Sequence, residues 1–166
     1  MTPTLTTARL LLTPLARSDA PAMIAVFADP ALYEFIGGKP PTRAELEARF
    51  DRWAAGSGRA REAWHNWAVR LAADRQPIGH LQATVVGSGE QSSADIAWLV
   101  GTPWQGAGYA SEAAGALVDW LRQSGVHAVT AHVHADHLAS ASIAARAGLA
   151  PTDEVDGGEV VWRLAL

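Results

Sequence analysis

Apolar residues recur with two different periods along this chain, and the period separates the predicted strands from the predicted helices. Alternation at every second position, as at Val160, Trp162 and Leu164, indicates a strand with one buried face. With the turn residues that bound them, six strands are expected, at residues 9–14, 66–71, 78–86, 93–100, 128–134 and 159–166. Spacings of three and four indicate four helices, expected at residues 19–27, 42–56, 109–124 and 138–147.

Local signals support several of these boundaries. Thr42 and Glu45 have the spacing of a capping box at the start of the second helix, and Gly125 and Gly148 are suited to end the last two helices. The order of elements gives an antiparallel first half followed by a strand–helix–strand crossover. It predicts one domain over residues 1–166 with a mixed sheet, an α+β class that some conventions call α/β.

The most informative loop is Gln105–Ala110, between the predicted strand 93–100 and the helix that begins near Tyr109. The first turn of a helix leaves backbone N–H groups unpaired, and the helix dipole adds about half a positive charge there. Gly106 and Gly108 allow a ligand to approach the backbone closely. The segment therefore predicts binding of a phosphorylated ligand.

Three known sequence patterns bind phosphate at the start of a helix, and this loop matches only the third of them. A P-loop requires Gly-Lys-Ser/Thr, which the chain lacks. A dinucleotide fingerprint requires Gly or Ala where Ser111 stands, and its ribose-binding acid would fall near Ala128. The third pattern, Gln/Arg-x-x-Gly-x-Gly/Ala, matches Gln105–Ala110 at every fixed position. An ordinary glycine turn that caps a helix is the structural alternative.

This third pattern resembles the pyrophosphate loop of the GNAT superfamily of acetyl-CoA-dependent N-acetyltransferases. Residues 134–149 resemble a later motif of its RimJ/RimL-like branch, in which Asn-x-Ala-Ser opens a helix and Leu-Gly-Phe closes it. Ala139 and Ser140 match that motif, whereas His137 replaces the Asn. Residues 7–15 resemble the first strand of the branch. The resemblance covers nearly the whole chain and implies a GNAT fold, with a mixed, mostly antiparallel sheet of about six to seven strands and about four helices.

The resemblance implies that acetyl-CoA is the co-substrate. Its pyrophosphate is expected on the backbone N–H groups of the glycine loop, and its pantetheine arm is expected to pair with one strand as an added strand would. His137 is expected to hydrogen-bond the pantetheine where relatives use Asn. The expected CoA-binding residues are Trp98, Leu99, Val100, Gln105, Gly106, Ala107, Gly108, Tyr109, Ala110, His137 and Ser140.

The implied reaction is attack of a neutral amine on a thioester, which requires a proton acceptor and stabilisation of the leaving thiolate. Asp95 aligns with a frequent family Glu and is expected to be the base, with a solvated strand Asp as the alternative. His80 and Glu34 are further candidates for that role.

The leaving group also needs support. Ser140 is expected to act near the sulfur together with His137, although a first-turn helix Ser is the structural alternative. Many relatives place a Tyr acid seven residues after the motif Asn. Ala144 stands there, so that acid is absent.

The acceptor is expected to be a primary amine, either a protein N-terminus or a small amine such as an aminoglycoside-like compound. Relatives contact it from the loop between the first two helices, which here contains Tyr33 and Glu34. Trp67 and His80 are also expected to contact the acceptor, and Trp64 and Trp67 with His65 could form a pocket wall that offers cation–π contact. A position in the core is the alternative for the Trp residues. A CoA-binding regulatory or interaction domain with weak catalysis is the alternative function.

Composition narrows the function further. The chain has 13 Lys and Arg against 17 Asp and Glu, a net charge of −4, which argues against a nucleic-acid partner. It has no Cys, so disulfides, thiolate metal sites and an acetyl-Cys route are excluded.

No apolar run reaches the length of a membrane span, and a cytoplasmic location without membrane contact is expected. No metal is expected, because His132 and His134 lack a convincing ligand set, and they are expected instead to be strand-end histidines that line the cleft. A homodimer is compatible with this branch.

Overall fold

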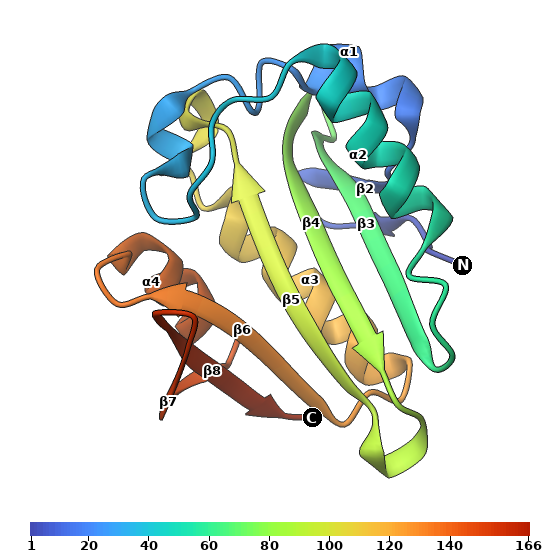
Figure 1. The fold of residues 1–166 in the computed structure, drawn as a ribbon, viewed down its shortest axis with the longest axis vertical. Helices are drawn as coiled ribbons and strands as arrows, with labels where there is room; N and C mark the ends of the chain where they lie inside the picture. Colours follow the sequence, from blue (N-terminus) through green and yellow to red (C-terminus); the bar gives the residue numbers. More distant parts are fainter.

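The computed structural model describes residues 1–166 as one mixed sheet with helices on both faces (Figure 1). The eight strands are β1 (Leu5–Thr6), β2 (Leu10–Pro14), β3 (Glu62–Leu71), β4 (Pro77–Val86), β5 (Ser93–Val100), β6 (Ala128–His134), β7 (Ala150–Asp156) and β8 (Glu159–Ala165). The four α-helices are α1 (Ala20–Met23), α2 (Arg43–Ala55), α3 (Tyr109–Gln123) and α4 (Leu138–Arg146). Short 3-10 turns occupy Arg17–Asp19, Pro30–Tyr33, Gly89–Gln91 and Thr102–Trp104.

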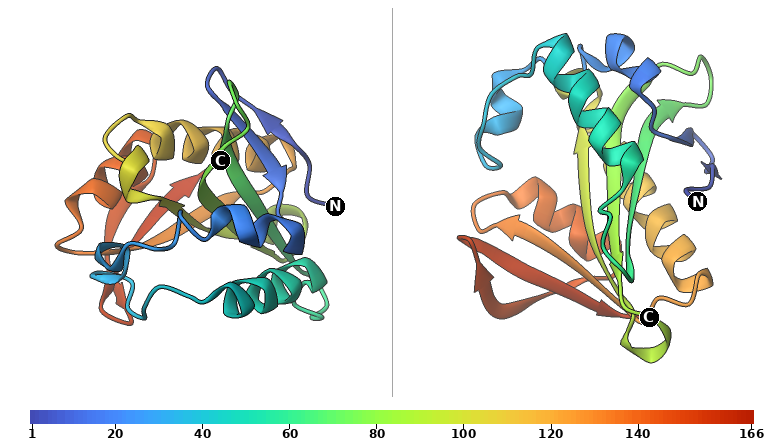
Figure 2. Two further views of the ribbon diagram at one scale, coloured as in Figure 1. Left: turned by 90° about the horizontal axis from the view of Figure 1, so that it is seen from above. Right: turned by 45° about the vertical axis from the view of Figure 1, so that its right-hand side comes forward.

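The strands lie in the order β1-β2-β3-β4-β5-β6-β8-β7. Every neighbouring pair is antiparallel except β5 and β6, which α3 connects as a crossover. Figure 2 shows α1 and α2 on one face of the sheet and α3 and α4 on the other. The predicted α+β class with a mixed, mostly antiparallel sheet and four helices is confirmed.

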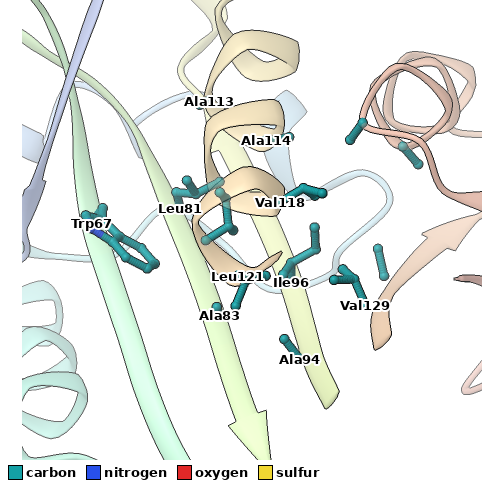
Figure 3. Packing of buried hydrophobic residues seen from close by; sticks show 14 of the residues in the cluster. Trp67, Leu81, Ala83, Ala94, Ile96, Ala113, Ala114, Val118, Leu121 and Val129 are labelled. Carbon is teal, nitrogen blue, oxygen red and sulfur yellow. The ribbon is translucent and has the colours of Figure 1, made fainter. Parts of the chain in front are cut away.

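Two apolar clusters fill the spaces between these layers. The larger has 21 buried residues and joins α3 and α4 to the sheet (Figure 3). The amphipathic pattern of α3 explains this, because Ala113, Ala114, Leu117 and Leu121 recur on one helical face. The smaller cluster has eight buried residues and seats α1 and α2 on the opposite face.

β5 and β6 are paired over only three residues. Ser93, Ala94 and Asp95 face Ala128, Val129 and Thr130, and beyond this point the two strands diverge, as the V between them in Figure 1 shows. β5 stays paired with β4 on its other side up to Val100. The part of β5 beyond Asp95 therefore has one strand edge without a partner strand.

The sequence prediction differs from the structure at four elements. β1 and β7 were missed, so the sheet has eight strands instead of six to seven. β1 has only two residues, and β7 contains Pro151 and a register shift, so neither carries a period-two pattern. The first predicted helix spans only Ala20–Met23 as an α-helix, followed by turns. β3 begins at Glu62, earlier than expected, whereas the capping box of Thr42 and Glu45 is present.

Two glycines provide a matched test of this packing. A Cβ on Gly79 of β4 would lie 2.4 Å from the carbonyl oxygen of Leu99, whereas a Cβ on Gly115 of α3 would meet nothing within 4 Å. Gly79→Ala is therefore expected to destabilise the protein by about 1–3 kcal/mol through overpacking. Gly115→Ala is expected to stabilise it by about 0.5–1 kcal/mol, because Ala is the better helix former. Urea unfolding of both variants measures this, and equal midpoints for the two would contradict the packing at Gly79.

Candidate active site

The glycine loop lies at the N-terminus of α3. Gly106 and Gly108 have φ values of 78° and 82°, the left-handed region that favours glycine, and Gly108 is the N-cap of the helix. The first N–H that bonds within the helix is that of Glu112, which donates to Gly108. The N–H groups of the turn before it have no intrahelical acceptor, so they are available to an anion.

Arg9, from the segment before β2, holds this loop against the helix. Its Nη1 donates to the carbonyl of Ala107 at 2.9 Å, its Nε donates to Glu112 at 2.7 Å, and its guanidinium lies 4.6 Å from the Tyr109 ring centroid. Thr7 donates to the same Glu112 carboxylate at 2.5 Å. Burial opposes ionisation of Glu112, but these hydrogen bonds outweigh it and lower its pKa. Glu112 is thus a structural brace for the loop.

The loop is also attached to the end of β5. Gln105 Nε2 donates to the Val100 carbonyl at 2.8 Å, so the predicted loop residue Gln105 acts here through its side chain. This bond occupies one backbone acceptor at the end of the open strand edge. The edge at Trp98 and Leu99 lies beyond the last residue that pairs with β6.

A cleft of about 730 Å³ opens where β5 and β6 diverge. It extends from the glycine loop to the segment after α1 and to the start of α4. The predicted CoA-binding residues lie along it with the exception of Ala107: Trp98, Leu99, Val100, Gln105, Gly106, Gly108, Tyr109, Ala110, His137 and Ser140. The structure thus brings together residues from β5, the loop and α4.

The α4 side of the cleft carries the two polar residues predicted from the second motif. His137 is the N-cap residue of α4 but makes no side-chain cap bond, and its ring stacks on Phe35 with centroids 4.4 Å apart. Burial and the neighbouring His134 lower the pKa of His137, although Glu34 opposes them. Ser140 lies one turn further along the helix and lines the same cleft.

Asp95 lies on the sheet face opposite α3, at the point where β5 and β6 separate. Its Oδ1 accepts a hydrogen bond from Thr130 Oγ1 at 3.1 Å and lies 3.2 Å from Nδ1 of His132. Burial raises the pKa of Asp95, and the nearby His132 and Thr130 only partly offset this effect. Asp95 itself does not line the cleft, whereas His132 does.

The structure removes two residues from the predicted acceptor pocket. Trp67 is fully buried in the larger cluster, where its Nε1 donates to the Pro3 carbonyl. His80 is 7% exposed, stacks on Trp53 at 4.4 Å and lies 3.1 Å from Asn66 Oδ1. Neither lines the cleft, so we correct both to core residues. Burial also lowers the pKa of His80 to about 3, which makes it a poor base.

Of the two residues predicted from the loop between the first helices, one lines the cleft and the other does not. Glu34 lines the cleft, whereas Tyr33 does not and donates instead to the carbonyl of Phe27. Ala144, which stands where relatives place a Tyr, is fully buried. Phe35, which the sequence analysis did not single out, and His132 also line the cleft. The alternation of His132 and His134 along one strand was the signal for His132, and it favoured strand-end histidines along the cleft over a metal site.

The described residues contain no group of three or more His, Cys, Asp or Glu that could hold a metal ion. No helix of the structure combines the length and the apolar character required to cross a membrane.

Residues 9–150 match the family model described as acetyltransferase (GNAT) domain. Among curated proteins, none matches the chain. An acetyltransferase from Agrobacterium tumefaciens is 27% identical, with a TM-score of 0.74, over 99% of this chain and 95% of that one.

Two further solved structures contain coenzyme A. The ribosomal-protein α-N-acetyltransferase RimL is 16% identical, with a TM-score of 0.81, over 99% of this chain and 98% of that one. The aminoglycoside acetyltransferase AAC(6')-Ib is 18% identical, with a TM-score of 0.76, over 94% of each chain. At these identities the likeness establishes the fold alone.

The residues present fit an acetyl-CoA co-substrate. The helix N-terminus and the glycine loop provide N–H donors for phosphate oxygens, and the open edge of β5 provides backbone groups for an amide-containing arm. Both features line one continuous cleft.

The loop assignment can be tested with a pair of matched glycines. Gly106 and Gly125 both have a φ of 78° and open space where a Cβ would stand, but only Gly106 lines the cleft. Gly106→Trp is expected to weaken CoA binding at least about 100-fold, because the ring would cover several N–H donors, each contributing about 0.3–1 kcal/mol. Gly125→Trp carries the same backbone strain and is expected to stay within about threefold of wild type. Calorimetric titration with CoA measures both, and equal affinities would refute the loop assignment.

The buried His80 generates a prediction about stability and pH. The unfolded chain protonates this residue below its ordinary pKa of 6.5, whereas the folded protein does so only near 3. Between these values the unfolded state binds more protons, so stability falls as the pH is lowered. The expected contribution is about 1.5 kcal/mol between pH 6.5 and 5. In His80→Gln the free energy of unfolding, measured in urea at each pH, should no longer show this decrease between pH 6.5 and 5. The exposed control His127→Gln should still show it. Parallel slopes for His80→Gln and wild type would contradict the assignment.

Proposed function

The chain belongs to the acetyltransferase (GNAT) domain family, and from this premise we propose that it transfers the acetyl group of acetyl-CoA directly to a primary amine. The observation that carries the proposal is the continuous cleft that opens where β5 and β6 diverge. One end of it offers N–H donors for an anionic ligand, and the other opens on a sheet face that carries carboxylates.

The charge around the cleft supports a cationic acceptor. Three acidic residues line it, Glu34, Asp136 and Glu159, while Arg146 is its only Arg or Lys. Asp95 and Asp156 flank the His132 ring, 3.2 Å from its Nδ1 and 3.6 Å from its Nε2. An ammonium group is therefore attracted to this end of the cleft.

The absence of Cys supports the proposed transfer without a covalent enzyme intermediate. The chain has no Cys, so an acyl-Cys route is closed. Acetyl-CoA supplies an activated thioester whose leaving thiolate is tolerable near neutral pH. Ser140 and His137 are the polar side chains of α4 in the cleft, and we place them beside the thioester sulfur.

The cost of forming a neutral amine favours one class of acceptor. Deprotonating a lysine-like amine at pH 7 costs about 4.6 kcal/mol, whereas an α-amine costs about 1 kcal/mol. We therefore propose an acceptor with an amine of low pKa, a protein N-terminus or an aminoglycoside-like compound. The second motif and the overall likeness to RimL support placement near the RimJ/RimL branch. A cytoplasmic location, where acetyl-CoA is present, is part of the same proposal.

A thiol-release assay tests this function. With acetyl-CoA present, we expect free thiol to form on addition of N-terminal peptides or aminoglycosides, and more slowly with lysine side-chain analogues. Mass spectrometry should show a gain of one acetyl group on the amine. Tight CoA binding without turnover of any amine in the panel would instead favour a CoA-binding regulatory domain.

A further inference from the structure

His132 has a special position on β6. Asp95 and Thr130 form the last pair between β5 and β6, and His132 is the next residue of β6 on the same face. It therefore stands at the base of the V, where the strands have just separated. Its side chain is 31% exposed and lines the cleft.

Asp95 lies beside one edge of the His132 ring. Asp95 Oδ1 lies 3.2 Å from Nδ1 of His132 and accepts a hydrogen bond from Thr130 Oγ1, which helps to orient the carboxylate. A carboxylate at this distance favours the ring tautomer with its proton on Nδ1. Nε2 then carries the lone pair.

Nε2 has no hydrogen-bond partner in the protein. The nearest carboxylate oxygen, Asp156 Oδ2, is 3.6 Å away, beyond hydrogen-bonding distance, and Asp156 is 75% exposed at the end of β7. Glu159, which lines the cleft, lies across from His134 on the neighbouring strand β8. These two acids attract an ammonium group toward Nε2 without occupying it.

We propose that His132 is the catalytic proton acceptor for the amine and that Asp95 is the positioning residue that fixes its tautomer. This inference rests on the proposed acetyl transfer to an amine. It places Asp95 in support of the base, because His132 lines the cleft and Asp95 does not. An imidazole also has an ordinary pKa closer to neutrality than a carboxyl group, which suits a general base at pH 7.

His132 Nε2 takes one proton from the substrate ammonium and later releases it to solvent. The freed nitrogen lone pair forms the bond to the acetyl carbon, and the carbon–sulfur bond breaks with its electron pair left on sulfur. The second proton lost by the nitrogen passes to the thiolate, which gives the amide and free CoA thiol.

The first experiment reads the ring tautomer without any acceptor. Long-range ¹H–¹⁵N NMR correlations of the labelled, CoA-bound protein at a pH where the imidazoles are neutral report which nitrogen of His132 carries the proton. We expect Nδ1–H in wild type and a shift toward Nε2–H in Asp95→Ala. The exposed Asp153→Ala on β7 is the control and should leave the tautomer unchanged. Nε2–H in wild type, or the same tautomer in Asp95→Ala, would overturn the proposal.

The second experiment measures kinetics with the panel amine that wild type acetylates fastest. His132→Ala is expected to lower kcat at least about 100-fold, with the KM for acetyl-CoA within about threefold. Added imidazole should restore part of this loss, which a structural defect would not allow. His127→Ala is the control and should show neither effect. Asp95→Ala is expected to lower kcat by about tenfold or more, because the ring is no longer held.

The outcomes separate the two proposals. An unchanged kcat in His132→Ala, or a loss that imidazole does not relieve, would overturn the base assignment while the amine transfer stands. If wild type acetylates no amine, the proposed function fails and the base role fails with it, even where the NMR tautomer is as expected.

Discussion

The short pairing between β5 and β6 is the constraint on which the rest of the molecule depends. Two parallel strands that separate after three residue pairs leave backbone donors and acceptors that must find other partners. In this protein Gln105 satisfies the last carbonyl of β5, and the remaining edge faces a cleft. The crossover helix α3 starts at the open end of the V, so its free N–H groups and the free strand edge share one space.

The glycine loop is held by contacts from the other end of the chain. Thr7 and Arg9 reach Glu112 and Ala107 across about 100 residues of sequence, and the ionised Glu112 carboxylate connects these partners. A glycine loop can change conformation at a small free-energy cost, because its residues have wide conformational freedom. The Arg9 brace restricts that freedom on the side away from the cleft and leaves the N–H groups of the helix start available.

Much of the architecture could be predicted from local patterns. The bounds of β5 and β6 follow from periodicity, and the loop at Gly106 and Gly108 follows from the need for left-handed backbone. What could not be predicted depends on contacts between distant segments. Trp67 appeared to be a pocket wall, but residues near the N-terminus cover it, and the pairing of His132 with Asp95 exists only once the strands meet. The strand β7, interrupted by irregular pairing, carried no periodic signal.

The open edge of β5 also bears on how the protein avoids self-association. An unpaired strand edge is a template on which another chain can add a strand, and it promotes aggregation when it lies at the rim of a sheet. At the outer rims the sheet has the two-residue β1 and the irregular, acid-bearing β7, both poor templates. The one long free edge lies inside the sheet, in a recess beneath Phe35 and His137, where a thin flexible arm can enter but a second sheet cannot.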